Sequence, residues 1–256
     1  MKARHIITVI LILIPVVSFS QSGKELPASR FKEASALYTS GKYQEALDIW
    51  TELYKSGYNS ASLNYNIGNC YFKLNNIPGS ILFYERALLL RPAGEDIRYN
   101  LQIARTMTVD KFAEIPELFF VTWFNFVSLS LASNTWATMS IIAFILSLIG
   151  ASAYFYSGRY RIKVTGFWAA IFLFVFSVAS YSFASRNRTL IFNNKNAIIF
   201  SPVVNGKSSP DSSGKDFFVI HEGTKVTVGE KVGDWCEIRL SDGNKGWVPV
   251  NSLTKL

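Results

Sequence analysis

Two long apolar stretches constrain this chain more than any other feature of its sequence. Residues 136–156 and 164–185 contain no charged side chain, and each gives an α-helix of about 30 Å, the thickness of a bilayer core. The loop between them carries Arg159, Arg161 and Lys163. Because positively charged loops stay in the cytoplasm, we expect a transmembrane hairpin with both flanking segments on the exported side. The alternative is a buried helical hairpin of a soluble protein.

The N-terminal segment, residues 1–20, has the pattern of a signal peptide. Its start is positively charged, residues 6–17 are apolar, and Ser18 and Ser20 are the small residues that cleavage requires. The apolar run is short for a membrane span. We therefore expect this segment to direct export and to be removed. An uncleaved anchor is the alternative.

Residues 118–133 form a third apolar segment, in which aromatic side chains such as Trp123 are mixed with Ser, Thr and Asn. As a helix, this segment would measure about 24 Å, less than the hydrocarbon thickness of about 30 Å. Helices that lie in the membrane interface carry Trp, Phe and Leu on the buried face. We therefore expect an in-plane interfacial segment. A third span is the alternative, and it would place the C-terminal part in the cytoplasm.

Residues 27–110 contain an internal repeat with an offset of 34 residues. Ala34 corresponds to Gly68, and Trp50 corresponds to Tyr84, so small residues pair with small ones and large with large. This pattern resembles the tetratricopeptide repeat (TPR), which has the same period and consists of a helix pair. The resemblance implies an α-helical array of about two and a half repeats. The offset also relates Leu37 to Tyr71, Tyr38 to Phe72, Ala46 to Ser80 and Leu47 to Ile81.

TPR arrays bind peptides or protein faces in a concave groove. By resemblance, the groove residues here are Tyr65, Asn69, Phe72 and Lys73. The alternative role of Tyr65 and Phe72 is packing between helices. Because Phe31 and Tyr65 occupy two positions of the carboxylate clamp found in some TPR proteins, we expect no site for a C-terminal carboxylate. The exposed end of so short an array is expected to dock on the interfacial segment or on another repeat protein.

Residues 195–256 change to short runs that alternate with turns rich in Gly, Asp, Asn and Ser. In residues 235–240, Cys236, Ile238 and Leu240 fall on one face, as in a half-buried strand. About five short strands in this length suit a small all-β barrel that closes its own edges. The expected strands are 197–200, 217–220, 225–228, 235–240 and 246–250.

The sequence of this barrel resembles bacterial SH3 (SH3b) domains. Residues 233–239 and 246–253 look like the distal half of an SH3 domain. By resemblance, Trp235 and Pro249 belong to the ligand groove, while Ser252 replaces the groove Tyr of eukaryotic domains. Polyproline binding is therefore not expected, and bacterial members bind peptidoglycan peptides or proteins. Trp247 is expected in the core, and Trp235 is assigned equally to core and groove.

Composition argues against several functions. The net charge is +8, but the excess lies at the boundaries of the apolar segments and not in one basic patch, so we expect no nucleic-acid binding. The only cysteines, Cys70 and Cys236, lie far apart, without zinc or iron–sulfur spacing, and Cys70 is expected to be a buried thiol. We find no nearby Asp or His partner for His221. We expect no cofactor, no metal site and no catalysis.

Taken whole, the chain resembles BatE-type proteins of the Bacteroides aerotolerance (Bat) operon family. The resemblance rests on residues 96–100 and 108–111 before the apolar block, and on the strings 221–224 and 246–247 of the barrel. It implies a bacterial inner-membrane scaffold with periplasmic TPR and SH3b domains. The implied partners are other Bat proteins with von Willebrand A-type or TPR domains, together with membrane lipid.

We expect the two binding modules to be independent of each other. The leading hypothesis is a non-enzymatic adaptor for protein partners of an aerotolerance or envelope-stress complex. One alternative is an SH3b module that binds peptidoglycan as a tether or sensor. Another alternative is a thiol redox sensor that uses Cys70 and Cys236.

Overall fold

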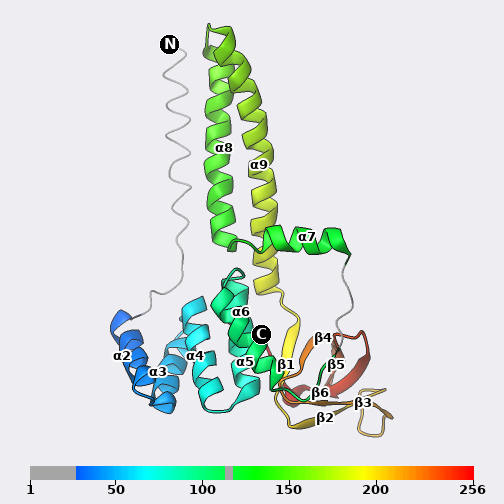
Figure 1. The fold of residues 1–256 in the computed structure, drawn as a ribbon. Coiled ribbons are helices and arrows are strands. Elements are labelled where there is room, and N and C mark those ends of the chain that lie inside the picture. The colour runs from blue at the N-terminus through cyan, green and yellow to red at the C-terminus, as the bar shows by residue number, and fades with distance from the viewer. Residues whose placement is uncertain (1–26, 113–117) are drawn as a thin grey trace.

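The fold comes from a computed structural model, which describes residues 27–112 and 118–256. Two long apolar helices, α8 and α9, form a hairpin that stands on a base (Figure 1). The base consists of a helical region and an antiparallel sheet, which lie at the same end of the hairpin (Figure 1). The expected signal peptide, residues 1–20, lies outside the described residues.

The helical region contains five helices, and each helix packs against the next one along the chain. Neighbouring helices therefore bury a continuous core, which no single helix pair could form alone. The helices are α2 (Ala28–Thr39), α3 (Tyr43–Lys55), α4 (Ala61–Lys73), α5 (Ile77–Leu90) and α6 (Glu95–Thr106).

The turns between these helices have a common cause. Gly41, Gly57 and Asn75 follow the ends of α2, α3 and α4 with positive φ angles of 81°, 90° and 59°. In each case the next N–H group bonds back to a carbonyl of the last helical turn, which closes the helix and reverses the chain. Ser60 then begins α4 by accepting a hydrogen bond from the Leu63 N–H group. Gly41 and Asn75 lie 34 residues apart, which is the offset of the repeat, so these two turns occupy equivalent positions.

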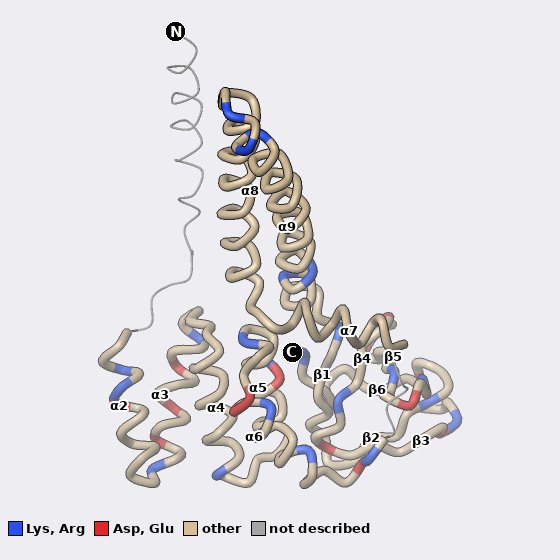
Figure 2. The backbone as a smooth tube through the Cα atoms, turned by 45° about the horizontal axis from the view of Figure 1, so that its top comes forward, with Lys and Arg blue, Asp and Glu red and all other residues tan. Residues whose placement is uncertain are grey.

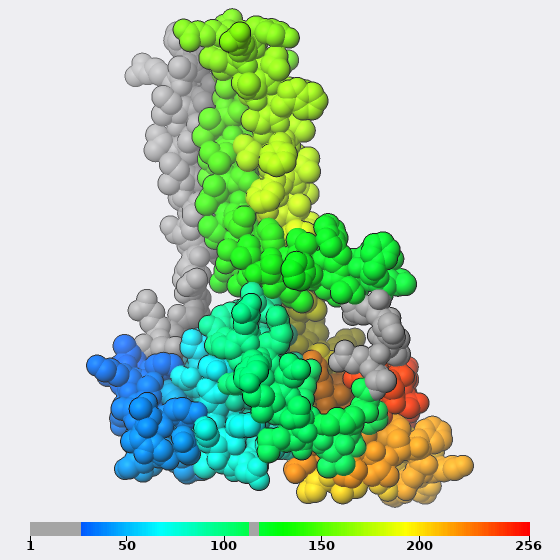
Figure 3. Space-filling model, in the orientation of Figure 1, coloured from blue at the N-terminus to red at the C-terminus, as the bar shows by residue number. Residues whose placement is uncertain are grey.

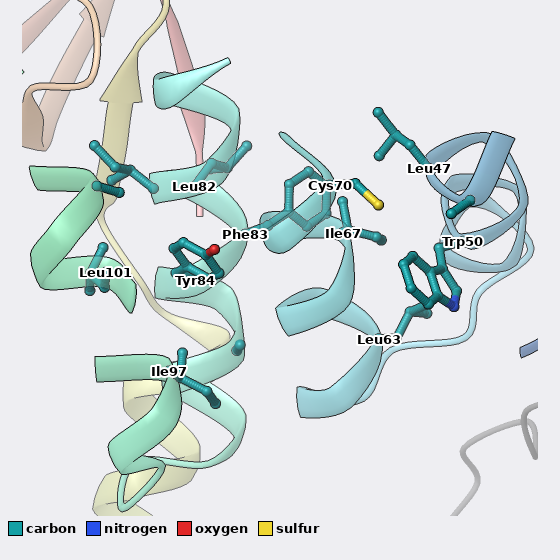
Figure 4. Close-up of a cluster of buried hydrophobic side chains, with 14 of the residues drawn as sticks. Leu47, Trp50, Leu63, Ile67, Cys70, Leu82, Phe83, Tyr84, Ile97 and Leu101 are labelled. Carbon is teal, nitrogen blue, oxygen red and sulfur yellow. The ribbon is translucent and has the colours of Figure 1, made fainter. Parts of the chain in front are cut away.

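Residues related by the offset occupy equivalent buried positions (Figure 4). Trp50 on α3 and Tyr84 on α5 are both almost completely buried. A Cβ atom on Gly68 would lie only 2.7 Å from the Tyr84 ring, so the close crossing of α4 and α5 requires glycine there. The pairing of small with small and large with large residues thus reflects how the helices pack.

Helices α8 (Ser133–Tyr156) and α9 (Tyr160–Phe192) are long and apolar enough to cross a membrane. Both are longer than the expected stretches 136–156 and 164–185, and α9 continues by seven residues beyond Ser185. Their contact is lined by small residues that bond to the opposite backbone. The hydroxyl groups of Ser140 and Ser177 each donate to the carbonyl of the other residue at 2.9 Å. Most large apolar side chains of the hairpin point outward.

The segment 118–133 contains a short helix, α7 (Phe119–Ser128), that lies across the base of the hairpin (Figure 1). Its ten residues measure about 15 Å, half of a bilayer core. Asn187 of α9 holds its end, because the Asn187 Nδ2 group donates to the Ser128 carbonyl at 2.8 Å. Phe119, Trp123 and Phe126 of α7 are largely exposed.

The C-terminal region forms one antiparallel sheet of seven strands, in the order β3-β2-β6-β5-β4-β1-β7. The sequence predicted five strands, and the structure adds β2 and β7. Strand β2 was missed because Gly206 breaks the apolar pattern, yet a Cβ atom there would lie 2.1 Å from the Phe218 ring. The strands are β1 (Asn196–Ile199), β2 (Val203–Lys207), β3 (Asp216–His221), β4 (Lys225–Val232), β5 (Trp235–Arg239), β6 (Lys245–Pro249) and β7 (Leu253–Lys255).

The sheet packs directly against the helical region, so the expectation of two independent modules is wrong. Strand β1 contacts α5, and Ile198 is completely buried in the helical core, whereas Ala197 and Ile199 belong to the core of the sheet. The sheet therefore covers one side of α5, the fourth of the five helices, and docking of the array's end on the interfacial segment or on another repeat protein stays a prediction. Figure 3 shows the two parts in contact.

A buried carboxylate reinforces this contact. Glu85 on α5 is 6% exposed and accepts hydrogen bonds from Arg105 of α6 and, at 2.8 Å, from Lys225 of β4. Burial by itself raises the pKa of Glu85, but the charges of Lys225 and Arg105 outweigh it and lower the pKa below its ordinary value. The carboxylate is therefore charged at neutral pH and joins the two parts.

A second carboxylate, Asp110, lies just after α6 and bonds to the sheet. It accepts from the His221 N–H group and the Thr224 hydroxyl at 2.6 Å each, and His221 Nδ1 lies 2.9 Å from it. The sequence-based view that His221 has no acidic partner is therefore wrong. Asp110 is 111 residues away along the chain, so no local pattern could have found it.

Replacing Glu85 with Ala should destabilise the base by about 2 kcal/mol, because Lys225 and Arg105 then lose their buried acceptor. The measurement is thermal unfolding of the full chain in detergent micelles. Since the pKa of Glu85 is lowered, its contribution is complete above pH 4.5 and disappears as the pH falls through the lowered pKa. The control Glu33→Ala, at an exposed ion pair, should change little. A Glu85→Ala midpoint equal to that of the wild type would contradict this role.

Candidate functional site

Four helices of the helical region enclose a pocket of about 280 Å³. The expected groove residues Tyr65, Asn69, Phe72 and Lys73 all lie on α4, and all four line this pocket. The structure therefore brings the expected set together on one surface. Tyr65 and Phe72 also pack against the helical core, so the packing role describes part of each side chain as well. The pocket is completed by Tyr38 of α2, Tyr84 of α5, and Asn100 and Ile103 of α6.

A hydrogen-bond network orders the floor of this pocket. The Tyr84 hydroxyl donates to Asn69 Oδ1 at 2.8 Å. The Asn100 Nδ2 group donates to the Tyr65 hydroxyl at 2.8 Å and to Asn69 Oδ1 at 3.2 Å. Burial raises the pKa of Tyr84, so its hydroxyl stays a neutral donor. Within the described part of the chain, these bonds leave the Asn69 Nδ2 group and the Tyr65 hydroxyl hydrogen available to donate hydrogen bonds to a ligand.

The sequence missed three of the polar groups in this pocket. Tyr38 could have been found, because it lies one offset before Phe72 in the repeat. Tyr84 was assigned only to packing, although its hydroxyl reaches the pocket floor. Asn100 lies on α6 in the incomplete third copy, where the offset relates it to Asn66 and not to one of the expected groove residues, so the repeat does not mark it.

The sheet carries the other expected surface. Trp235 of β5 and Pro249 of β6 lie directly opposite each other in the antiparallel ladder, and both are half-buried. Alternation along β5 sends Cys236 and Ile238 into the core and leaves Trp235 on the outer face. Trp247 is likewise half-buried on the outer face of β6, while its neighbour Val248 fills the core, so its expected core position is wrong.

Residues 203–254 match the bacterial SH3 domain family. The match covers β2 to β6 and the first two residues of β7. Because β1 belongs to the same sheet, residues 195–256 are called the SH3 domain below. A search of curated proteins finds no match to the chain. Ser252, which replaces the Tyr of eukaryotic domains, is buried, and its hydroxyl donates to the Pro249 carbonyl at 2.6 Å. The side chain thus fixes the turn beside the Trp235–Pro249 surface and does not line that surface.

The three cations that were used to orient the hairpin lie together at its tip (Figure 2). Arg159 caps the start of α9, and Arg161 and Lys163 lie in its first turn. All three are exposed. The tip is the end of the hairpin that points away from the helical region and the SH3 domain (Figure 1).

The two cysteines lie in separate hydrophobic cores. Cys70 is buried in the helical core and Cys236 in the core of the SH3 domain, and both are free thiols. Burial raises the pKa of the Cys70 thiol to about 12 and also raises the pKa of Cys236. Redox-sensing cysteines are accessible and have low pKa values. The surroundings of both thiols therefore oppose a redox role.

No cluster of metal-binding side chains comes together in the described part of the chain. Across residues 27–112 and 118–256, no three His, Cys, Asp or Glu side chains could hold one metal ion. His221 and Asp110 form a pair, and Asp110 also accepts hydrogen bonds from the His221 N–H group and the Thr224 hydroxyl. The pair therefore joins the segment after α6 to the sheet.

The thiol environment gives a direct prediction. Both native cysteines should react with Ellman's reagent at pH 8 at least about a hundredfold more slowly than an exposed thiol, because each is buried and protonated. The comparison is the variant Ser40→Cys, which adds an exposed thiol after α2. Adding guanidinium chloride should make all thiols reactive. Rapid reaction of Cys70 in the folded chain would contradict the buried assignment.

Proposed function

We propose that this protein is a membrane-anchored, non-enzymatic scaffold. In this proposal the helical region is a TPR array that binds a protein partner, and the SH3 domain binds a second ligand. The observation that carries it is the pocket on α4, in which four residues chosen by resemblance to TPR grooves line one surface. The Trp235–Pro249 surface lies on other elements, β5 and β6, and supports a second, separate ligand.

The proposed membrane arrangement follows from charge and length. Helices α8 and α9 cross the membrane, the tip with Arg159, Arg161 and Lys163 faces the cytoplasm, and the base lies on the exported side. The signal-peptide pattern of residues 1–20 supports the same direction. Helix α7 then lies in the interface, with Trp123 among the side chains that enter the lipid.

The proposed setting is an envelope-stress or aerotolerance complex of the bacterial inner membrane. The resemblance to the Bat family supports this setting and suggests von Willebrand A-type or TPR-containing neighbours as partners. A scaffold fits this role, because two surfaces on one base hold two partners at a fixed separation. Two partners bound to linked sites meet each other at an effective concentration on the order of millimolar.

The groove assignment can be tested by photo-crosslinking in intact membranes. A photoreactive residue in place of Lys73, at the pocket rim, should give a discrete protein adduct. The same residue in place of Lys55, in a separate hollow between α3 and α4, should not. Replacing Asn69 with Ala should reduce the Lys73 adduct by about tenfold, since the amide is central to the pocket. Identical adducts from both positions would contradict a groove on α4.

Peptidoglycan is the second candidate ligand, and the match to bacterial SH3 domains favours it. Purified cell wall should then sediment the full chain from detergent solution. Trp235→Ala should lower the retained fraction by at least about tenfold, because a central aromatic side chain dominates most binding surfaces. Phe217→Ala, at an exposed aromatic residue of β3, should leave retention unchanged. Failure of the wild type to sediment would leave a protein as the ligand of this domain.

A further inference from the structure

The segment from α7 to the start of the SH3 domain has an unbalanced charge. Between residues 118 and 195 the sequence contains no Asp or Glu. Positive side chains at both ends of the hairpin therefore cannot pair with an acid from their own segment. An anion from outside the segment is needed to balance them. The positive side chains are Arg159, Arg161, Lys163, Arg186, Arg188 and Lys195.

Of these six cations, Arg186 has both a hydrogen bond and an aromatic contact to α7. Its Nη2 group donates to Asn125 Oδ1 of α7, and its guanidinium lies 5.0 Å from the centre of the Phe124 ring. Its Nη1 group is buried and has no hydrogen-bond partner among the described residues. Burying an N–H group without an acceptor costs free energy, and the cost is larger when the group belongs to a charged guanidinium. We call Phe124, Asn125 and Arg186 the α7–α9 corner.

The corner lies at the right depth for a lipid headgroup, if the hairpin spans the membrane as proposed above. Lys163 and Arg186 are separated by about 35 Å along α9, slightly more than the hydrocarbon core of about 30 Å. With Lys163 at one headgroup layer, Arg186 therefore reaches the other. Exposed aromatic side chains of α7, such as Trp123, lie beside the corner and are typical of this depth.

We propose that the α7–α9 corner binds the phosphate group of an anionic phospholipid. Because Nη1 is buried, the side chains around it must shift before a phosphate oxygen can supply the acceptor that it lacks. A guanidinium can then hold two phosphate oxygens at once. The aromatic face of α7 then packs on the acyl chains next to that headgroup. Such a lipid would fix the angle between α7 and α9, and with it the base, relative to the membrane surface.

Arg188 provides a matched control within the same helix. It carries the same charge at nearly the same depth, but two residues along a helix place it on the opposite side, where its guanidinium lies over the Phe192 ring. General attraction to a charged surface should involve Arg188 as much as Arg186. A specific site should involve Arg186 alone.

The test is native mass spectrometry of the full chain, purified in detergent and titrated with phosphatidylglycerol or phosphatidylcholine of the same acyl chains. The wild type should bind phosphatidylglycerol about fivefold more tightly. Arg186→Gln should remove this preference, and Arg188→Gln should keep most of it. Arg186→Lys preserves the charge and tests the proposal if the Gln variant does not fold. It should fall between the two, because an ammonium group lacks the planar pair of donors with which a guanidinium binds two oxygens in parallel.

Three results would overturn the proposal. These are the absence of a phosphatidylglycerol preference, an equal loss in the Arg186→Gln and Arg188→Gln variants, and displacement of the lipid by equimolar inorganic phosphate. The last would indicate a simple anion site. Carbonate extraction of membranes that contain the full chain separates this inference from the proposed function on which it rests. A chain released by carbonate contradicts membrane anchorage, whereas a retained chain without lipid preference contradicts the corner alone.

Discussion

Strand β1 serves two hydrophobic cores at once, and the arrangement of the whole base depends on it. Ile198 enters the helical core, while Ala197 and Ile199 enter the core of the SH3 domain. The strand follows α9 after only a short connection, in which the Lys195 carbonyl accepts a hydrogen bond from the Val228 N–H group at 2.6 Å. The second apolar helix is thus linked directly to the strand that joins the two folded parts.

This contact also accounts for the shortness of the helical array. Repeat arrays need their terminal hydrophobic faces covered, and about three repeats are normally required for stability. Here the SH3 domain extends the helical core beside α5, because Ile198, Phe200 and Leu256 pack against that core. Glu85 adds a charged link at the same place. The pocket on α4 is lined by other residues and stays open, so the SH3 domain adds to the helical core without covering the groove.

The sequence predicts those features that depend on short spacings. The apolar periodicity locates the hairpin, the offset of the repeat pairs Trp50 with Tyr84, and alternation assigns Cys236 and Ile238 to the core. It cannot reveal contacts between distant residues, such as Lys225 with Glu85, because no local pattern encodes them. Strand β2 was missed for a related reason, since Gly206 is explained only by Phe218 on the neighbouring strand. In the pocket, the four residues on α4 follow from the resemblance to TPR grooves, whereas Asn100 does not.

The most direct test of this account is the distance between the helical region and the SH3 domain in a lipid bilayer. Spin labels can be placed on α3, at Lys55, and on β4, at Lys231, and their separation measured by double electron–electron resonance. Because β1 and Glu85 join the two parts, we predict one narrow distance distribution. A broad distribution, or several separate distances, would show that the two parts move independently and would contradict the account.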